Sequence, residues 1–116
     1  MLFICYPKCS TCLKAKKWLD DRSIKYEERN IKENNPTYDE LKKWHKESGL
    51  ELNKFFNTSG ILYREMKLKD KLVDMSDDEK LKLLSSDGML VKRPLLIDDN
   101  GVLVGYKEKE WLEKYA

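Results

Sequence analysis

Apolar positions at the start of the chain pass from a strand-like run to a helical spacing. Residues 2–6 form a short apolar run that favours β-structure, and Pro7 ends it. From residue 10 to about residue 22 the apolar residues recur on one helical face. Residues 24–31 then alternate apolar and polar side chains for part of their length. Strand, helix and strand in close succession predict a right-handed βαβ unit with parallel strands.

The middle of the chain carries helix-start signals. The T-x-x-E motif at 37–40 and the S-x-x-E motif at 76–79 are capping boxes, in which two side chains satisfy the free N–H groups of a helix start. Each predicts a helix, and Gly49 and Gly88 are the expected stops. Residues 52–69 place apolar pairs on both sides of an Asn-Thr-Ser-Gly sequence and predict short helices with a turn.

A period of two returns near the end. Residues 95–97 and 102–104 are apolar and flank the sequence Asp-Asp-Asn-Gly at 98–101. An Asn-Gly pair between apolar runs predicts a tight hairpin, because both residues tolerate positive φ. Residues 108–115 have helical spacing and predict a closing helix. The predicted order is β-α-β, several helices, then β-β-α, which makes the chain an α/β protein.

The length and net charge of the chain exclude some classes of protein. The 116 residues suffice for one domain with its own core. Lys and Arg number 23 against 21 Asp and Glu, so the formal net charge of +2 gives no footprint for direct nucleic-acid binding. The apolar N-terminal run is too short for a signal sequence or a membrane span. We therefore expect a cytoplasmic protein with reduced thiols and no membrane partner.

Two of the three cysteines, Cys9 and Cys12, are spaced as C-x-x-C at the start of the first predicted helix. Free backbone N–H groups and the helix dipole favour a thiolate there, and Lys8 adds positive charge. We therefore expect Cys9 to be the attacking sulfur. Cys12 lies one turn further on, within disulfide range, and is the expected resolving thiol. A C-x-x-C beside a βαβ unit is typical of a thioredoxin-like redox site.

Two other interpretations of the cysteines stay open. The pair could form half of a zinc site, but Cys5 would have to leave its strand and His45, the single histidine, would have to approach from another helix. The cysteines could also be inert apolar residues, which suits Cys5 better than Cys9. His45 lies beside charged residues and is expected to be solvated. We expect no bound metal or organic cofactor.

The sequence Tyr-Pro-Lys-Cys-Ser-Thr-Cys at 6–12, with Lys-Arg-Pro-Leu-Leu at 92–96, resembles the arsenate reductase (ArsC) family, which includes the Spx-type regulators. The resemblance covers nearly the whole chain and is greatest to an arsenate-reductase-like branch. It implies a single thioredoxin-like domain over residues 1–116, of the glutaredoxin type, with a helical insertion at about 37–88 between the β-α-β and β-β-α halves.

The resemblance also implies roles. Cys9 matches the family's nucleophile, which attacks arsenate, and Arg93 matches the arginine that binds the oxyanion. Pro94 matches a proline that is usually cis in thioredoxin-like folds. An external thiol reductant, glutathione with glutaredoxin or else thioredoxin, would regenerate the site. A guanidinium suits a tetrahedral oxyanion because it donates two parallel hydrogen bonds.

Two further arginines of the family's reductases are not matched. Their positions fall in 57–59 (Asn-Thr-Ser) and near 106–107 (Tyr-Lys). Arg64 is a candidate to supply charge instead, and Lys107 another. The candidate substrate-binding residues are Lys8, Arg64, Arg93 and Pro94.

Two functions remain in view. The leading expectation is an arsenate-reductase-like thiol–disulfide oxidoreductase that acts on a small oxyanion or a disulfide and meets a redox partner protein. The alternative is an Spx-type redox-sensing transcription regulator that binds the RNA polymerase α subunit. In the alternative the C-x-x-C pair is a switch rather than a catalyst.

Overall fold

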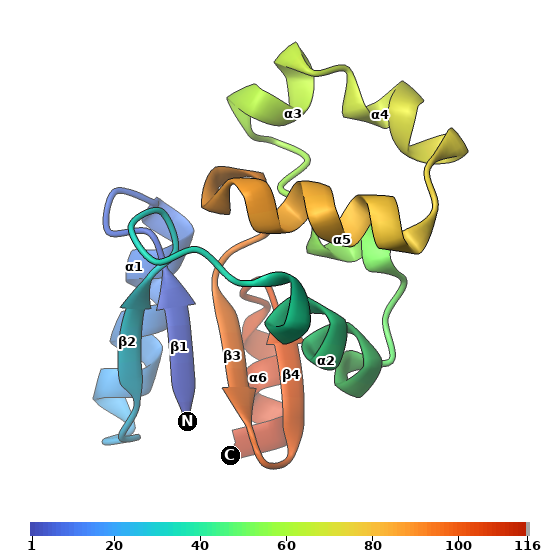
Figure 1. Cartoon of the computed structure of the whole chain (residues 1–116). Coiled ribbons are helices and arrows are strands. Elements are labelled where there is room, and N and C mark those ends of the chain that lie inside the picture. The colour runs from blue at the N-terminus through green and yellow to red at the C-terminus, as the bar shows by residue number, and fades with distance from the viewer. Residues whose placement is uncertain (116) are drawn as a thin grey trace.

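A single mixed sheet lies at the centre of the chain, with helices packed on both faces (Figure 1). The structure is a computed structural model that describes residues 1–115. Short 3-10 helices are labelled η. The elements in order are β1 (Leu2–Cys5), α1 (Ser10–Asp21), β2 (Glu27–Asn30), α2 (Tyr38–Ser48), η1 (Leu52–Phe55), α3 (Ile61–Glu65), α4 (Leu68–Lys71), η2 (Leu72–Asp74), α5 (Asp77–Ser86), η3 (Gly88–Leu90), β3 (Leu95–Asp98), β4 (Gly101–Val104) and α6 (Glu108–Tyr115).

The strand order is β2-β1-β3-β4. Strand β1 pairs in parallel with β2 and antiparallel with β3, and β3 forms an antiparallel hairpin with β4. Helices α1 and α6 lie on one face of this sheet and α2 on the other, as Figure 1 shows. Both the strand order and the placement of the helices confirm the predicted thioredoxin-like fold of the glutaredoxin type.

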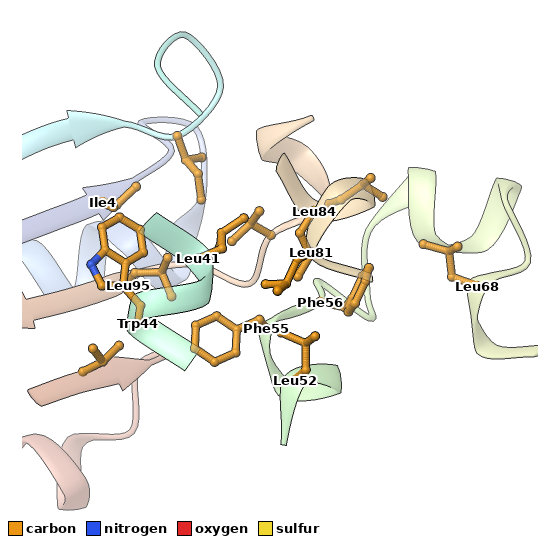
Figure 2. Packing of buried hydrophobic residues seen from close by; sticks show 14 of the residues in the cluster. Ile4, Leu41, Trp44, Leu52, Phe55, Phe56, Leu68, Leu81, Leu84 and Leu95 are labelled. Atoms are coloured by element: carbon orange, nitrogen blue, oxygen red, sulfur yellow. The ribbon is translucent and has the colours of Figure 1, made fainter. Parts of the chain in front are cut away.

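Alternation along β1 divides the apolar interior into two clusters. Phe3 and Cys5 point toward α1 and α6, whereas Ile4 points toward α2. The cluster around Ile4 extends away from the sheet into the helices that follow β2, as Figure 2 shows. Phe55 and Leu84 are completely buried there, so the helical segment between β2 and β3 shares its core with the sheet.

Both capping boxes are present. The Thr37 and Ser76 side chains accept hydrogen bonds from the backbone N–H groups of Glu40 and Glu79, and these glutamates bond back to the cap residues. Helix α2 ends at Gly49 in the left-handed conformation (φ 69°) that glycine adopts without steric cost. Each of these helix ends is formed by residues a few positions apart in the chain, which is why the sequence predicts where the helices begin and end.

Strand β2 is shorter than the residue pattern predicts. It covers Glu27–Asn30 rather than 24–31, because it pairs only with β1, which itself has four residues. The hairpin is also shifted by one position. Asp98 pairs with Gly101, so the two-residue turn is Asp-Asn at 99–100 and Gly101 (φ +131°) begins β4.

Gly88 has a different role from the predicted helix stop. Helix α5 ends at Ser86, and Gly88 begins η3. A Cβ atom at position 88 would lie 1.8 Å from the carbonyl oxygen of Ile31. Gly88 is therefore required for the close approach of η3 to the end of β2, immediately before the chain reaches residues 92–94.

An ion pair joins β2 to α2. The Arg29 guanidinium donates to both carboxylate oxygens of Glu40, at 2.7 and 2.9 Å, and also to the carbonyl oxygens of Asn34 and Asn35. The hydrogen bonds from Arg29 are the main reason that the pKa of Glu40 lies below its ordinary value. Both side chains are mostly buried, so water weakens the pair less than it weakens a surface pair.

We expect Glu40→Gln to lower the free energy of unfolding by about 1–2 kcal/mol at neutral pH, because the bidentate charged contact is lost. Since the pKa of Glu40 is lowered in the folded chain, the contribution is complete above the ordinary value and disappears as the pH falls through the lowered one. Urea unfolding of both proteins between about pH 7 and pH 3 measures this difference.

Asp21→Asn is the matched control, because it removes an exposed helix ion pair with Lys17. Its effect is expected to stay within about 0.5 kcal/mol. A Glu40→Gln effect that equals the control, or that grows toward acid pH, would contradict the role given to the Arg29–Glu40 pair.

Candidate active site

The turn after β1 places Cys9 at the start of α1. The Cys9 N–H donates to the carbonyl oxygen of Tyr6 at 2.9 Å, which closes a turn with Pro7 at its second position, a place that proline favours. The Cys9 carbonyl then accepts from the Leu13 N–H at 3.1 Å, so Cys9 is the N-cap residue of α1. Its thiol is partly exposed and faces a cavity.

Cys12 lies behind Cys9 and is almost completely buried, with 1% of its surface exposed. Its Sγ accepts a hydrogen bond from the Tyr6 N–H at 3.3 Å, and its side chain packs in the same apolar cluster as Cys5. Hydrogen bonding to Cys5, followed by burial, raises the pKa of Cys12 well above its ordinary value. None of Cys5, Cys9 and Cys12 is joined to another cysteine by a disulfide bond in the structure.

The cavity in front of Cys9 has a volume of about 610 Å³ and is built from four separate segments of the chain. These are the start of α1, the turn before α3, the segment from η3 to β3, and the segment between β4 and α6. The lining residues are Cys9, Thr11, Asn57, Ser59, Gly60, Ile61, Leu62, Met89, Lys92, Arg93, Val104, Gly105, Tyr106 and Lys107.

Arg93 supplies a cation that has no carboxylate partner among residues 1–115. Within residues 1–115, the buried Nε and Nη1 atoms of Arg93 have no hydrogen-bond acceptor. The guanidinium carbon lies 5.3 Å from the centre of the Tyr6 ring, which supports the group from one side. Buried N–H groups without acceptors destabilise a fold by about 1–3 kcal/mol each, so an arrangement of this kind is typical of a binding site. Arg93 also lines the cavity in front of Cys9.

The other predicted residues are placed differently. The Arg93-Pro94 peptide bond is cis, and the Pro94 carbonyl accepts from the Gly105 N–H at 2.8 Å, which holds the two sides of the cavity together. Lys8 is exposed and does not line the cavity. Arg64 is also exposed and borders a separate shallow depression on α3. The structure therefore brings Cys9, Cys12 and Arg93 together, and leaves Lys8 and Arg64 outside.

Asn57 and Lys92 also line the cavity, and the sequence analysis did not predict a place in the site for either residue. Asn57 is 8% exposed, and its backbone N–H donates to the Leu90 carbonyl at 2.8 Å. A Cβ atom at position 60 would lie 2.7 Å from the Asn57 side-chain nitrogen, so Gly60 allows the turn to close over Asn57. The Asn-Thr-Ser-Gly sequence predicted the turn, but not that Asn57 would be buried in the lining of the cavity. For Lys92 the sequence offered only one indication, its position directly before Arg93.

The structure gives no support to the alternative of a metal site within the described residues. Among residues 1–115, no group of three or more His, Cys, Asp or Glu side chains is placed to hold a metal ion. His45 packs edge-on against Phe55, with ring centres 6.0 Å apart, and is only partly exposed rather than solvated. No helix among these residues has the length and apolar character required to cross a membrane.

Comparison with known proteins agrees with this geometry. Residues 5–114 match the ArsC family. The chain is 53% identical to the uncharacterized protein YusI of Bacillus subtilis over 116 residues, which covers all of this chain and 98% of YusI. It is 31% identical to the global transcriptional regulator Spx of Staphylococcus epidermidis over 104 residues, which covers 90% of this chain and 78% of Spx.

A solved structure agrees as well. The crystal structure of a possible arsenate reductase from Streptococcus mutans UA159 superposes with a TM-score of 0.88 at 50% identity, covering 97% of this chain and 96% of that one. The chain belongs to the ArsC family.

The thiols are expected to differ sharply in accessibility. Iodoacetamide near neutral pH should label Cys9 in the folded protein and leave Cys5 and Cys12 unlabelled, because these two are 3% and 1% exposed. All three should be labelled in guanidinium chloride. Intact mass before and after denaturation counts the labels.

The Cys9→Ser variant is the control and should take up no label while folded. Labelling of this variant at the rate of the wild type would show that a second thiol is accessible, and the assignment of Cys9 as the exposed thiol would be wrong.

Proposed function

We propose that this chain is a cytoplasmic thiol–disulfide oxidoreductase of the ArsC family, with Cys9 as nucleophile and Cys12 as resolving thiol. One observation carries the proposal: Cys9 and Arg93, which has no carboxylate partner among residues 1–115, line the same cavity, and Cys12 lies directly behind Cys9. The arrangement combines a nucleophile, a cation that can hold an anionic substrate, and a second thiol that can complete a disulfide.

The proposed reaction can be written as a balanced sequence of steps for two kinds of substrate, a disulfide and arsenate. With a disulfide, the Cys9 thiolate attacks one sulfur and expels a thiolate, and Cys12 then attacks the Cys9 sulfur and expels the second. With arsenate, Cys9 forms a sulfur–arsenic bond as water leaves. Attack of Cys12 on Cys9 then breaks that bond, leaves its electron pair on arsenic and releases arsenite. In both cases Cys9 and Cys12 end as a disulfide, which an external dithiol or two glutathione molecules reduce.

The surroundings of each sulfur fit its step. Cys9 is the N-cap residue of the 12-residue helix α1, and its partly exposed thiol faces the cavity, where a substrate can reach it. Cys12 is buried and keeps its proton at neutral pH, because hydrogen bonding to Cys5 and burial raise its pKa. It is therefore a poor initial nucleophile. It becomes a useful one only when Cys9 has formed a bond to substrate beside it.

The charge around the cavity supports an anionic substrate. Arg93 lines the cavity, and Lys92 and Lys107 add two further cations to the lining. A guanidinium holds a tetrahedral oxyanion or a carboxylate through paired hydrogen bonds, whereas an ammonium group acts as a point charge. Arg93 is thus the proposed anion-binding residue, with the lysines as longer-range support.

The deciding experiment measures NADPH consumption coupled to thioredoxin or to glutaredoxin with glutathione, with arsenate or a small disulfide as substrate. We expect the wild type to turn over at least one of these substrates. Cys9→Ser and Cys12→Ser should both lose activity, because the route passes through an internal disulfide. Activity that survives in Cys12→Ser would contradict the resolving role of Cys12. No turnover with any combination would overturn the proposed oxidoreductase.

Arg93→Lys tests the anion site within the same assay. It keeps a positive charge but loses the paired donors, so kcat/KM should fall by about 10–100-fold. Arg64→Lys is the matched control, since Arg64 is exposed and lies outside the cavity, and it should leave kcat/KM unchanged. Equal effects of the two substitutions would contradict the role of Arg93.

A second candidate function rests on the similarity to Spx, at 31% identity over 104 residues. In that case the Cys9–Cys12 pair would be a redox switch in a regulator that binds the RNA polymerase α subunit. Purified α C-terminal domain, incubated with the reduced and the oxidised chain, separates the two functions. As an oxidoreductase the chain should show no redox-dependent retention. Retention in one redox state, together with no turnover in the NADPH assay, would favour the regulator.

A further inference from the structure

The third cysteine lies in contact with the pair. Cys5 is the last residue of β1, is 3% exposed, and packs in the same apolar cluster as Cys12. Cys9 packs against that cluster from the cavity side, and the Cys12 Sγ accepts a hydrogen bond from the N–H of Tyr6, the residue after Cys5, at 3.3 Å. Cys12 therefore lies between two thiols, one on the cavity side and one in the core.

The sequence places these three sulfurs in a row for local reasons. The period of two along β1 turns Cys5 toward α1. The helical period of α1 turns Cys12 back toward the sheet, and the turn from Tyr6 to Cys9 brings the start of α1 to the end of β1. Packing alone would be satisfied by any small apolar residue at position 5, so the sulfur at this position adds a reactive group that packing does not require.

The thiol of Cys5 has a proton acceptor. It donates a hydrogen bond to Glu28 Oε1 at 3.5 Å. Glu28 belongs to β2, and its carboxylate also receives hydrogen bonds from Lys16 at 3.1 and 3.2 Å. Lys16 thus holds the carboxylate against the sheet where it can accept a proton from a buried sulfur. Glu28 is itself 42% exposed, so it can pass that proton to water.

We propose that Cys5 is a third redox-active thiol, which exchanges with the Cys9–Cys12 disulfide and moves it into the core. This inference rests on the proposed function, because that reaction supplies the first disulfide. In the exchange, Glu28 takes the proton of Cys5 and the Cys5 sulfur attacks Cys12. The Cys9–Cys12 bond breaks, a Cys5–Cys12 bond of about 2.05 Å forms, and Cys9 leaves as a thiolate. One disulfide replaces another, so no further oxidant or reductant is consumed.

The exchange has a chemical consequence. The oxidised site would hold its disulfide away from solvent while Cys9, the accessible sulfur, is again free to react. A reductant then reaches the buried disulfide through Cys9, which attacks Cys12 in the reverse step. The position of the disulfide would decide whether the oxidised protein presents a thiol or a disulfide to its partners.

Peptide mapping tests this directly, because trypsin cleaves after Lys8 and separates Cys5 from the other two cysteines. The wild type is oxidised with a small excess of oxidised glutathione, quenched with acid, alkylated with iodoacetamide and digested. A Cys5–Cys12 disulfide joins peptide 1–8 to peptide 9–14, with the alkyl group on Cys9. A Cys9–Cys12 disulfide stays within peptide 9–14.

We expect the joined peptides, with Cys9 alkylated, to appear after the internal Cys9–Cys12 form. The Cys5→Ser variant should stop at the internal form. Glu28→Gln should slow the conversion by at least about tenfold, because the proton acceptor is lost. Glu27→Gln is the matched control on the same strand, and its rate should equal the wild type.

The outcomes separate this inference from the proposed function. If the wild type gives only the internal Cys9–Cys12 disulfide, or peptides joined through Cys9, the role of Cys5 is overturned and the proposed oxidoreductase stands. If neither disulfide forms, the proposed function fails and the exchange fails with it. The mapping of the wild type decides the question even if a variant folds poorly.

Discussion

Strand β1 is constrained on both edges and both faces, and the site follows from that constraint. Its two edges pair with β2 and β3, and its side chains alternate between two apolar clusters. A strand held in this way can neither slip by one residue nor twist out of place, because a slip would exchange the two faces. The point where β1 ends is therefore fixed, and with it the turn that sets Cys9 at the start of α1.

Next to this rigid strand, the cavity contains a side chain, Arg93, with buried N–H groups that lack hydrogen-bond acceptors. Arg93 brings buried N–H donors to a position where no acceptor among residues 1–115 meets them, and Tyr6, in the turn after β1, supports the guanidinium. Buried N–H groups without acceptors destabilise the fold, and they persist only where the surrounding structure holds the side chain in place. Pro94 and Gly105 provide this restraint through the hydrogen bond that joins the two sides of the cavity.

The sequence predicts those features whose causes are local. The capping boxes at Thr37 and Ser76 and the helical position of the C-x-x-C pair depend on residues a few positions apart. The thioredoxin-like sheet is instead implied by the family resemblance, because β1 pairs with β3, which is distant in the sequence. The length of β2 depends instead on how many residues of β1 are available to pair. Gly88 contacts the backbone of Ile31, far away in the chain, so its role could not be read from its neighbours.

The same distinction explains the candidate site. Cys9 and Cys12 are predicted by their spacing, and Arg93 by resemblance, whereas the position of Arg64 depends on how α3 packs. The helix presents Arg64 to solvent, and Arg64 is not among the residues that line the Cys9 cavity. The row of sulfurs that includes Cys5 combines a strand period, a helix period and the turn between them. Each is visible in the sequence, but only their combination brings the thiols into contact.

The cavity also bears on the choice between catalyst and switch. A redox switch needs two thiols that can meet, and the pair at the start of α1 provides that without any space in front of it. A catalyst needs a volume for substrate and a group that holds it. Here Arg93 lines a volume of about 610 Å³ and holds buried N–H groups that have no acceptor among residues 1–115, at a cost to stability that a switch does not require. That cost is why the proposed oxidoreductase accounts for more of the structure than a switch does.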